Sequence, residues 1–170
     1  MFIFAIKLLF ISYMITFHTS SWSDLTRDQF HAILRLRISV FVVEQNCPYP
    51  ELDAKDLSSI QVYALKNDEN IALGDSAVAC VRICAPGVSY PEPSIGRVAT
   101  RQDCRKTGLG IEVMKRSIDV CESAFPGQGI RISAQCYLEK FYSDLGFSST
   151  GETYLEDDIL HVQMFRPSTS

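Results

Sequence analysis

The sequence lacks the features that mark several common protein classes. It has only three histidines, and no two cysteines show the CxxC spacing of a zinc or redox site. No glycine is followed by lysine, so the P-loop motif is absent. The 16 basic residues are outnumbered by 20 acidic ones, and a net charge of −4 lacks the basic surplus of a nucleic-acid-binding face. We therefore expect no metal site, no P-loop chemistry and no nucleic-acid partner.

The six cysteines allow either a disulfide framework or free thiols. They show no paired spacing along the chain: Cys47, Cys80, Cys84, Cys104, Cys121 and Cys136. Cys121 lies on the apolar stripe of a predicted helix, and Cys80 and Cys84 lie in a strand-like run. We predict buried free thiols that pack as small hydrophobic side chains, in a reducing, cytoplasmic location.

The first 13 residues, MFIFAIKLLFISY, are apolar but too short to span a bilayer. Lys7 interrupts the apolar run and no small-x-small cleavage site follows, so the segment does not fit a signal peptide. It is either an extension from an upstream start site or a weak anchor, and association with a membrane is not expected. We expect residues 14–167 to form a single domain, followed by a tail over 168–170.

Hydrophobic periodicity predicts an α/β domain in the order β-α-β-β-β-α-β-α-β-β. Thr26 and Gln29 match a capping box and open a predicted helix over 26–42. A short helix is predicted over 138–145, and a second helix over 108–124 has an apolar face of Ile111, Met114, Ile118, Cys121 and Phe125. The predicted strands are 14–22, 61–66, 71–83 (long, or broken at Gly74-Asp75), 95–100, 130–134, 151–155 and 159–166.

The strands at 95–100 and 130–134 flank the second helix and should be parallel neighbours joined by a right-handed crossover. The other strands are expected to pair mostly antiparallel. The fold class is therefore a mixed, mostly antiparallel twisted sheet with a central parallel strand pair and helices on its faces.

A basic glycine turn, Arg105-Lys106-Thr107-Gly108-Leu109-Gly110, joins the 95–100 strand to the second helix. Free N–H groups of a first helical turn and the helix dipole favour an anion such as a pyrophosphate. Glycine removes the Cβ atoms that would hold phosphate oxygens away from the backbone. The turn lacks the third glycine of a G-x-G-x-x-G dinucleotide motif.

This turn between strand and helix resembles the [Arg/Gln]-x-x-Gly-x-[Gly/Ala] motif of the GNAT superfamily of N-acetyltransferases. Four further segments resemble the ElaA-type branch of that family: 39–49 (SVFVVEQNCPY), 95–98 (IGRV), 134–142 (from Ala-Gln to Phe-Tyr) and 146–147 (Gly-Phe). The resemblance implies that the two parallel strands splay apart and hold the pantetheine arm of acetyl-CoA, the co-substrate, between them. It also implies transfer of the acetyl group to a primary amine by direct attack in a ternary complex.

Carried over residue by residue, the resemblance assigns a general acid and a set of cofactor contacts. Tyr142 would protonate the leaving sulfur. The expected contacts to CoA are Val98, Ala99, Thr100, Arg105, Lys106, Thr107, Gly108, Leu109, Gly110 and Gln135.

The general base is open at this stage. Glu44 could accept a proton or attract a cationic amine, and His161 could act as a base near neutral pH. A dedicated base is not required where the enzyme acts mainly by positioning two substrates. Arg97 and Glu51 are candidates for shaping the acceptor pocket.

Two acidic segments could attract a cationic amine or could simply be solvated loops. They comprise Glu51, Asp53 and Asp56 in the first loop and Glu156, Asp157 and Asp158 in the last hairpin. The expected acceptor is a small-molecule or peptide amine, and the chain could be a monomer or a homodimer. The alternatives to an enzyme are a CoA-binding module without catalytic activity and a cofactor-free interaction domain.

Overall fold

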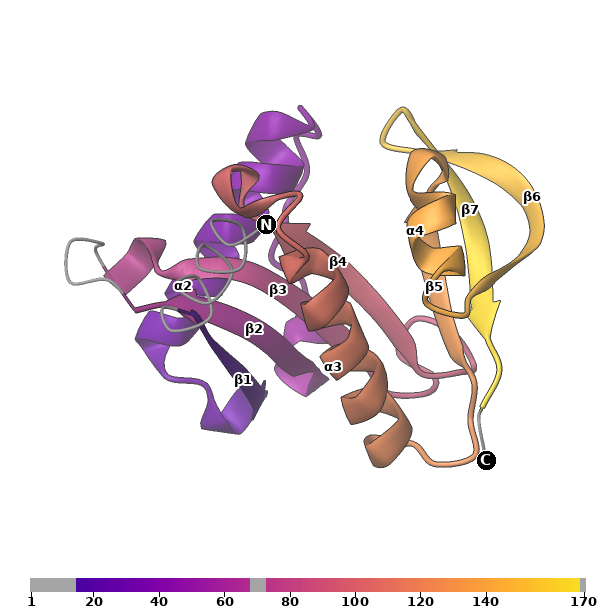
Figure 1. The fold of residues 1–170 in the computed structure, drawn as a ribbon, viewed down its shortest axis with the longest axis horizontal. Coiled ribbons are helices and arrows are strands. Elements are labelled where there is room, and N and C mark those ends of the chain that lie inside the picture. The colour runs from indigo at the N-terminus through magenta and orange to yellow at the C-terminus, as the bar shows by residue number, and fades with distance from the viewer. Residues whose placement is uncertain (1–14, 68–72, 169–170) are drawn as a thin grey trace, which may run out of the picture.

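The computed structural model describes residues 15–67 and 73–168 of the chain. In this part the strands form one sheet in the order β1-β2-β3-β4-β5-β7-β6 (Figure 1). The strands are β1 Ile15–Ser21, β2 Ile60–Lys66, β3 Ala77–Cys84, β4 Ser94–Thr100, β5 Ile130–Gln135, β6 Ser148–Glu156 and β7 Ile159–Arg166. The main helices are α2 Arg27–Arg37, α3 Leu109–Ala124 and α4 Glu139–Ser143. The predicted mixed sheet and the order of its elements are confirmed. The leader predicted over 1–13 lies outside the described residues.

The parallel pair β4 and β5 is joined at one end only. Ser94 is the one β4 residue in register with β5, opposite Arg131, and the Arg131 amide donates to the carbonyl of Pro93 at 3.0 Å. Beyond this point the strands diverge toward Thr100 and Gln135 (Figure 1). β5 instead pairs with β7 along its whole length. The sheet is therefore open at the carboxyl ends of β4 and β5.

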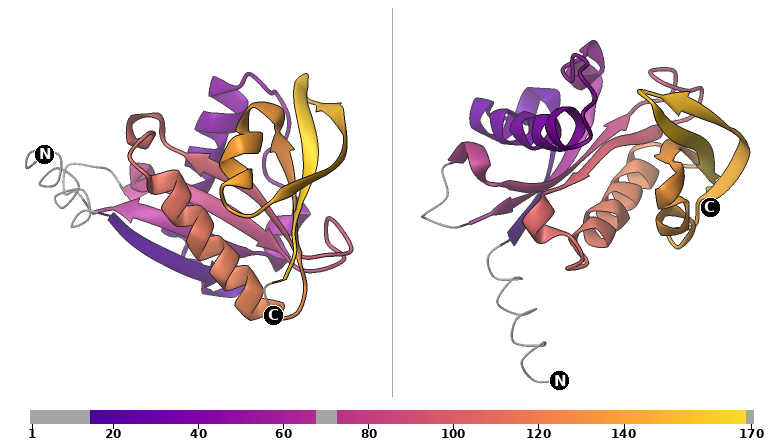
Figure 2. Two further views of the ribbon diagram at one scale, coloured as in Figure 1. Left: turned by 45° about the vertical axis from the view of Figure 1, so that its right-hand side comes forward. Right: turned by 90° about the horizontal axis from the view of Figure 1, so that it is seen from above.

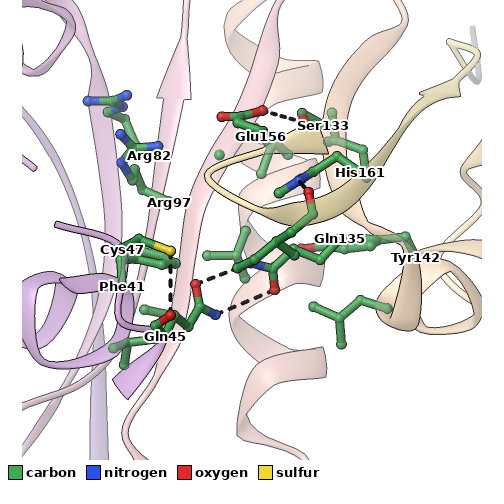
Figure 3. Close-up of a pocket in the computed structure, with 18 of the residues that line it drawn as sticks. Phe41, Gln45, Cys47, Arg82, Arg97, Ser133, Gln135, Tyr142, Glu156 and His161 are labelled. Carbon is green, nitrogen blue, oxygen red and sulfur yellow. Dashed lines mark hydrogen bonds between the residues drawn. The ribbon is translucent and has the colours of Figure 1, made fainter. Parts of the chain in front are cut away.

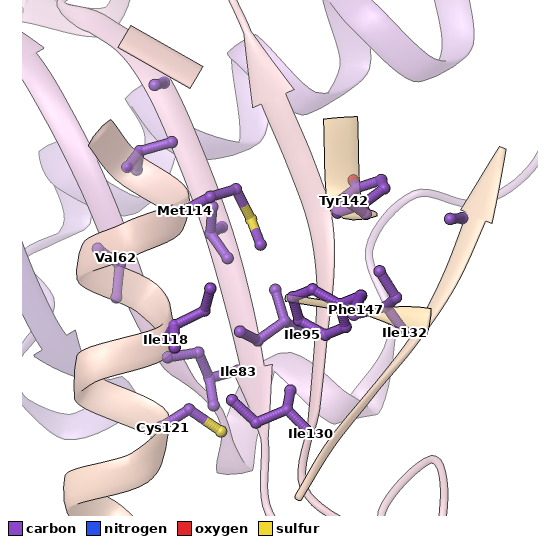
Figure 4. Close-up of a cluster of buried hydrophobic side chains, with 14 of the residues drawn as sticks. Val62, Ile83, Ile95, Met114, Ile118, Cys121, Ile130, Ile132, Tyr142 and Phe147 are labelled. Carbon is purple, nitrogen blue, oxygen red and sulfur yellow. The ribbon is translucent and has the colours of Figure 1, made fainter. Parts of the chain in front are cut away.

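Helices cover both faces of the sheet. Figure 2 shows α2 on one face and α3 with α4 on the other. All eight residues of β3 are buried, because this central strand is covered on both sides. The larger core cluster packs α3 side chains such as Met114 and Ile118 against Ile83 and Ile130, and it also includes Tyr142 and Phe147 (Figure 4).

Two local predictions differ from the structure. The capping box of Thr26 and Gln29 is present, but the helix predicted to end at 42 changes to a π-helix over Ile38–Glu44. On α3, Met114, Ile118 and Cys121 are buried as predicted, whereas Ile111 is 46% exposed. Of the two forms predicted for 71–83, the broken one is confirmed: a 3-10 turn, Leu73–Asp75, precedes β3. Residues 71–72 lie outside the described part.

Candidate active site

A cavity of about 680 Å³ opens between the splayed strands. Its walls come from the π-helix, β4, the glycine turn, β5, α4 and the β6–β7 hairpin (Figure 3). Most of the predicted site residues line it: Glu44, Val98, Ala99, Thr100, Arg105, Lys106, Gly110, Gln135, Tyr142 and His161. Thr107, Gly108 and Leu109 do not line it, and the Leu109 side chain packs into the core.

The glycine turn leaves the N-terminus of α3 open to an anion. Gly108 caps the helix in the left-handed region (φ 90°), and no side chain caps the first turn. A Cβ atom at Gly108 would meet no atom within 4 Å, and one at Gly110 would lie 3.5 Å from Thr100 Oγ1. The first turn of α3 therefore has no side-chain cap, and neither glycine carries a side chain that would keep an anion away from its amides.

Arg105 in this turn is held by Glu44 from the end of the π-helix. Its Nη1 and Nη2 donate to the two carboxylate oxygens at 2.6 and 2.8 Å, and its Nε donates to the carbonyl of Thr100 at 3.0 Å. The hydrogen bond from Arg105, with its charge, lowers the pKa of Glu44. Glu44 is therefore a weak proton acceptor that adds a negative charge beside the proposed phosphate site.

Glu44→Gln is expected to tighten CoA binding about two- to fivefold, because an exposed ion pair of this kind contributes about 1 kcal/mol or less and competes with a phosphate for Arg105. Calorimetric titration with CoA at two salt concentrations measures the change, which should shrink at high salt. Weaker CoA binding by the variant would contradict this account of Arg105. A large loss of turnover would instead assign Glu44 as the base.

A β-bulge in β4 aims Arg97 into the cavity. Cys80 lies opposite Ala99 and Arg82 opposite Gly96, so β4 carries one residue more than β3 between these pairs. Arg97 takes a left-handed conformation (φ 51°) at this bulge. Bulges re-aim side chains in this way and are common next to active sites. The Arg97 guanidinium lies over the ring of Tyr49 at 5.5 Å.

Behind this wall lies a buried ion-pair network that the sequence did not predict. Arg37 is fully buried; its Nε donates to Glu51 at 2.5 Å and its Nη1 to Asp56 at 2.7 Å. Arg82 bridges Asp53 and Asp56 at 2.7 and 3.1 Å. Burial would raise the pKa of Asp56, but hydrogen bonds and charge from Arg37 and Arg82 outweigh it and hold that pKa low. Glu51 and Asp56 are thus neither solvated nor exposed to an amine, which corrects both interpretations of this acidic loop.

Tyr142 lies at the base of the cavity, where α4 follows β5. Its side chain is buried against Phe141 and Phe147, with ring centroids at 5.0 and 6.1 Å. No residue in the described part of the chain hydrogen-bonds to its hydroxyl, and Tyr142 lines the cavity. Burial raises the pKa of this phenol, which therefore keeps its proton at neutral pH.

His161 lies on β7, which pairs with β5, and it is in register with Gln135. Its Nδ1 is 2.8 Å from the carbonyl oxygen of Ile159. Because a carbonyl only accepts, Nδ1 carries the proton and Nε2 keeps its lone pair. Gln45, a cavity residue that the sequence analysis did not single out, accepts a 3.1 Å hydrogen bond from Gln135 across the mouth of the cleft (Figure 3). Gln45 directly follows Glu44 in the 39–49 segment, and this position could have identified it as a site residue.

Several known proteins are similar to this chain in sequence and in fold. Residues 60–166 match the family described as "Acetyltransferase (GNAT) domain". ElaA of Escherichia coli (strain K12) is 36% identical over 155 residues, which cover 90% of this chain and 97% of ElaA. The crystal structure of E. coli ElaA matches with a TM-score of 0.79 and 33% identity, covering 90% of this chain and 99% of that one.

A crystal structure titled as an acyl-CoA N-acyltransferase from Pseudomonas aeruginosa is equally similar. It matches with a TM-score of 0.81 and 34% identity, and the match covers 89% of this chain and 99% of that one. No helix in the described part of the present chain is long and apolar enough to cross a membrane. Together with the open parallel strand pair, these matches show that the chain belongs to the GNAT acyltransferase family, in its ElaA-type branch.

Proposed function

We propose that the chain is an acetyl-CoA-dependent N-acetyltransferase that moves an acetyl group to a primary amine by direct attack in a ternary complex. The observation that carries this proposal is the cleft between β4 and β5, with the uncapped N-terminus of α3 at its open end. The six cysteines are unpaired thiols in the structure, which supports a reducing location such as the cytoplasm.

CoA binding would use main-chain and side-chain groups at different depths of the cleft. The amides of the first turn of α3, with Arg105 and Lys106, would bind the pyrophosphate. The pantetheine arm would lie between the splayed strands, beside Val98, Ala99 and Thr100 on β4. Gln45 and Gln135 would then lie over the arm, since their hydrogen bond crosses the mouth of the cleft.

The chemistry assigns opposite proton transfers to two residues that line the cavity, Tyr142 and His161. The amine nitrogen attacks the thioester carbon, the C–S bond breaks, and the sulfur takes a proton from Tyr142. The attacking nitrogen loses a proton to His161 Nε2, whose position in the cavity and tautomer favour it over the ion-paired Glu44 as base. Holding both substrates in one cleft supplies much of the acceleration.

Tyr142→Phe is expected to lower kcat by about 100-fold, because it removes a positioned proton donor, while CoA affinity stays unchanged. The matched control is Tyr63→Phe, which removes the hydroxyl of a buried tyrosine on β2 that does not line the cavity and should have a much smaller effect. Single-turnover release of CoA thiol measures the chemical step. Equal rates for Tyr142→Phe and the parent would remove the proton-donor assignment.

A CoA-binding module without catalysis is the alternative function. Calorimetric titration with CoA tests the binding site, and a screen for release of free CoA thiol across amines and peptides tests transfer. CoA binding with no release from any amine would support the alternative. Absence of CoA binding would overturn both.

A further inference from the structure

The acceptor side of the cavity has two walls of opposite charge. Arg82 on β3, Arg97 on β4 and Lys55 from the loop beside them line one side of it. The partners of the two arginines, Glu51 for Arg97 and Asp53 with Asp56 for Arg82, do not line the cavity. Glu156 and Asp157 line the opposite wall, on the β6–β7 hairpin. Figure 3 shows Arg82 and Arg97 on one side and Glu156, Ser133 and His161 on the other.

On the cationic wall, the guanidinium of Arg97 has N–H donors that are not used within the described residues. Its Nε donates to Glu51 at 2.9 Å, and this is its only hydrogen bond within the described residues, so both Nη groups remain free. The bulge in β4 and the rings of Phe41 and Tyr49 hold the guanidinium, about three quarters buried, against the cavity. A desolvated guanidinium with two free Nη groups matches a carboxylate, which it can bind through paired charge-assisted hydrogen bonds.

Glu156 supplies the opposite charge on the far wall. Its Oε2 accepts a hydrogen bond from Ser133 Oγ at 3.3 Å, which holds the carboxylate on the side of β5. His161, the proposed base, lies on the adjacent strand β7. An ammonium drawn to Glu156 would thus arrive beside His161. The ammonium loses one proton to solvent to become the neutral amine, and His161 Nε2 takes the second proton as the C–N bond forms.

Resting on the proposed function, we propose that the acceptor is a zwitterion: a primary amine that carries a carboxylate, as free amino acids do. Arg97 binds the carboxylate through its Nη groups, and Glu156 attracts the ammonium. A plain polyamine would place a cation against Arg97, and a simple amine would leave the Nη groups unpaired when the cavity fills; both are disfavoured.

The test compares free amino acids with their amides, on the full chain in the presence of CoA. Each pair differs only at the carboxylate, and the amide has the more weakly basic amine, so amine reactivity alone favours the amide. We expect the preferred amino acid to exceed its amide by about tenfold or more in affinity and in kcat/KM, the scale of a charge-assisted hydrogen bond. Equal binding of acids and amides would overturn the inference.

Arg97→Met is expected to weaken binding of the amino acid about 10- to 100-fold and to leave binding of the amide nearly unchanged. Activity on the amide and a thermal melt confirm that the variant is folded. The matched control is Arg131→Met, which removes a guanidinium paired with Glu92 away from the cavity and should keep the preference for the acid. A preference that survives in Arg97→Met would overturn the role of Arg97.

The binding arm separates this inference from the proposed function. Calorimetry with CoA and an amino acid reports on Arg97 without turnover. Failure of every amine to release CoA thiol, with the preference for acids intact, would remove the transferase activity and keep the carboxylate site. Transfer to acids and amides at equal rates would keep the transferase activity and remove the carboxylate site.

Discussion

Gly110→Asp is expected to weaken CoA binding by at least about 100-fold, the largest effect on the proposed site. Its carboxylate would lie at the first turn of α3, where the phosphates are proposed to bind. Two like charges about 4 Å apart repel by about 4 kcal/mol near a protein surface. Each 1.4 kcal/mol of lost binding energy raises the dissociation constant for CoA by a factor of about ten. Titration calorimetry with CoA measures the loss.

Two matched variants isolate the cause. Gly110→Ala adds a Cβ atom at an ordinary contact distance of 3.5 Å from Thr100 Oγ1, so the fold should tolerate it. Gly151→Asp adds the same charge on β6. A Cβ atom there would meet no atom within 4 Å, and Gly151 does not line the cavity. Unchanged CoA affinity in Gly110→Asp would refute the pyrophosphate site; an equal loss in Gly151→Asp would point to net charge instead.

Arg37→Met is expected to reduce the free energy of unfolding by about 3–5 kcal/mol, because removing one partner leaves buried carboxylates uncompensated. For a chain of this size that corresponds to a fall in Tm of about 10 °C. Arg35→Met is the matched control on the same helix. Arg35 pairs with Asp75 at the surface, where both side chains are about half exposed, and should cost little.

The deficit of Arg37→Met should also depend on pH. Arg37 helps to hold the pKa of Asp56 low, so its contribution is present above the ordinary carboxyl pKa and is lost as the pH falls through the folded value. The difference between parent and variant should therefore be largest at neutral pH and shrink in acid. Urea unfolding at several pH values measures it. A deficit under 1 kcal/mol at pH 7 would contradict the role given to the network.

The family resemblance and the periodicity of the chain together predicted the sheet, the crossover between β4 and β5, and the cleft. The capping box of Thr26 and the glycine turn are local signals, which depend on neighbouring residues and survive in the fold. The stripe of α3 was predicted correctly at Met114, Ile118 and Cys121 and wrongly at Ile111, which is exposed, because helical spacing does not fix where the edge of a buried face lies. The assignments of Tyr142, His161 and the CoA contacts remain predictions.

The buried network was missed although its signal was present. Arg37 follows Leu36 on the face of α2 that is buried, and Arg82 interrupts the otherwise apolar run of β3. An arginine inside an apolar segment needs a carboxylate partner, since a buried charge is costly alone. The partners come from the loop over 51–56, which looked solvated only because each carboxylate was judged without its distant arginine.

The sequence by itself determined which segments become helices and strands, and that a glycine turn precedes the N-terminus of α3, because these depend on residues close together in the chain. Tertiary structure alone decided that Glu44 pairs with Arg105, that the bulge in β4 turns Arg97 into the cavity, and that cations and carboxylates face each other across it. Charge interactions act through space, so their partners are set by the packing of the sheet and not by spacing along the chain.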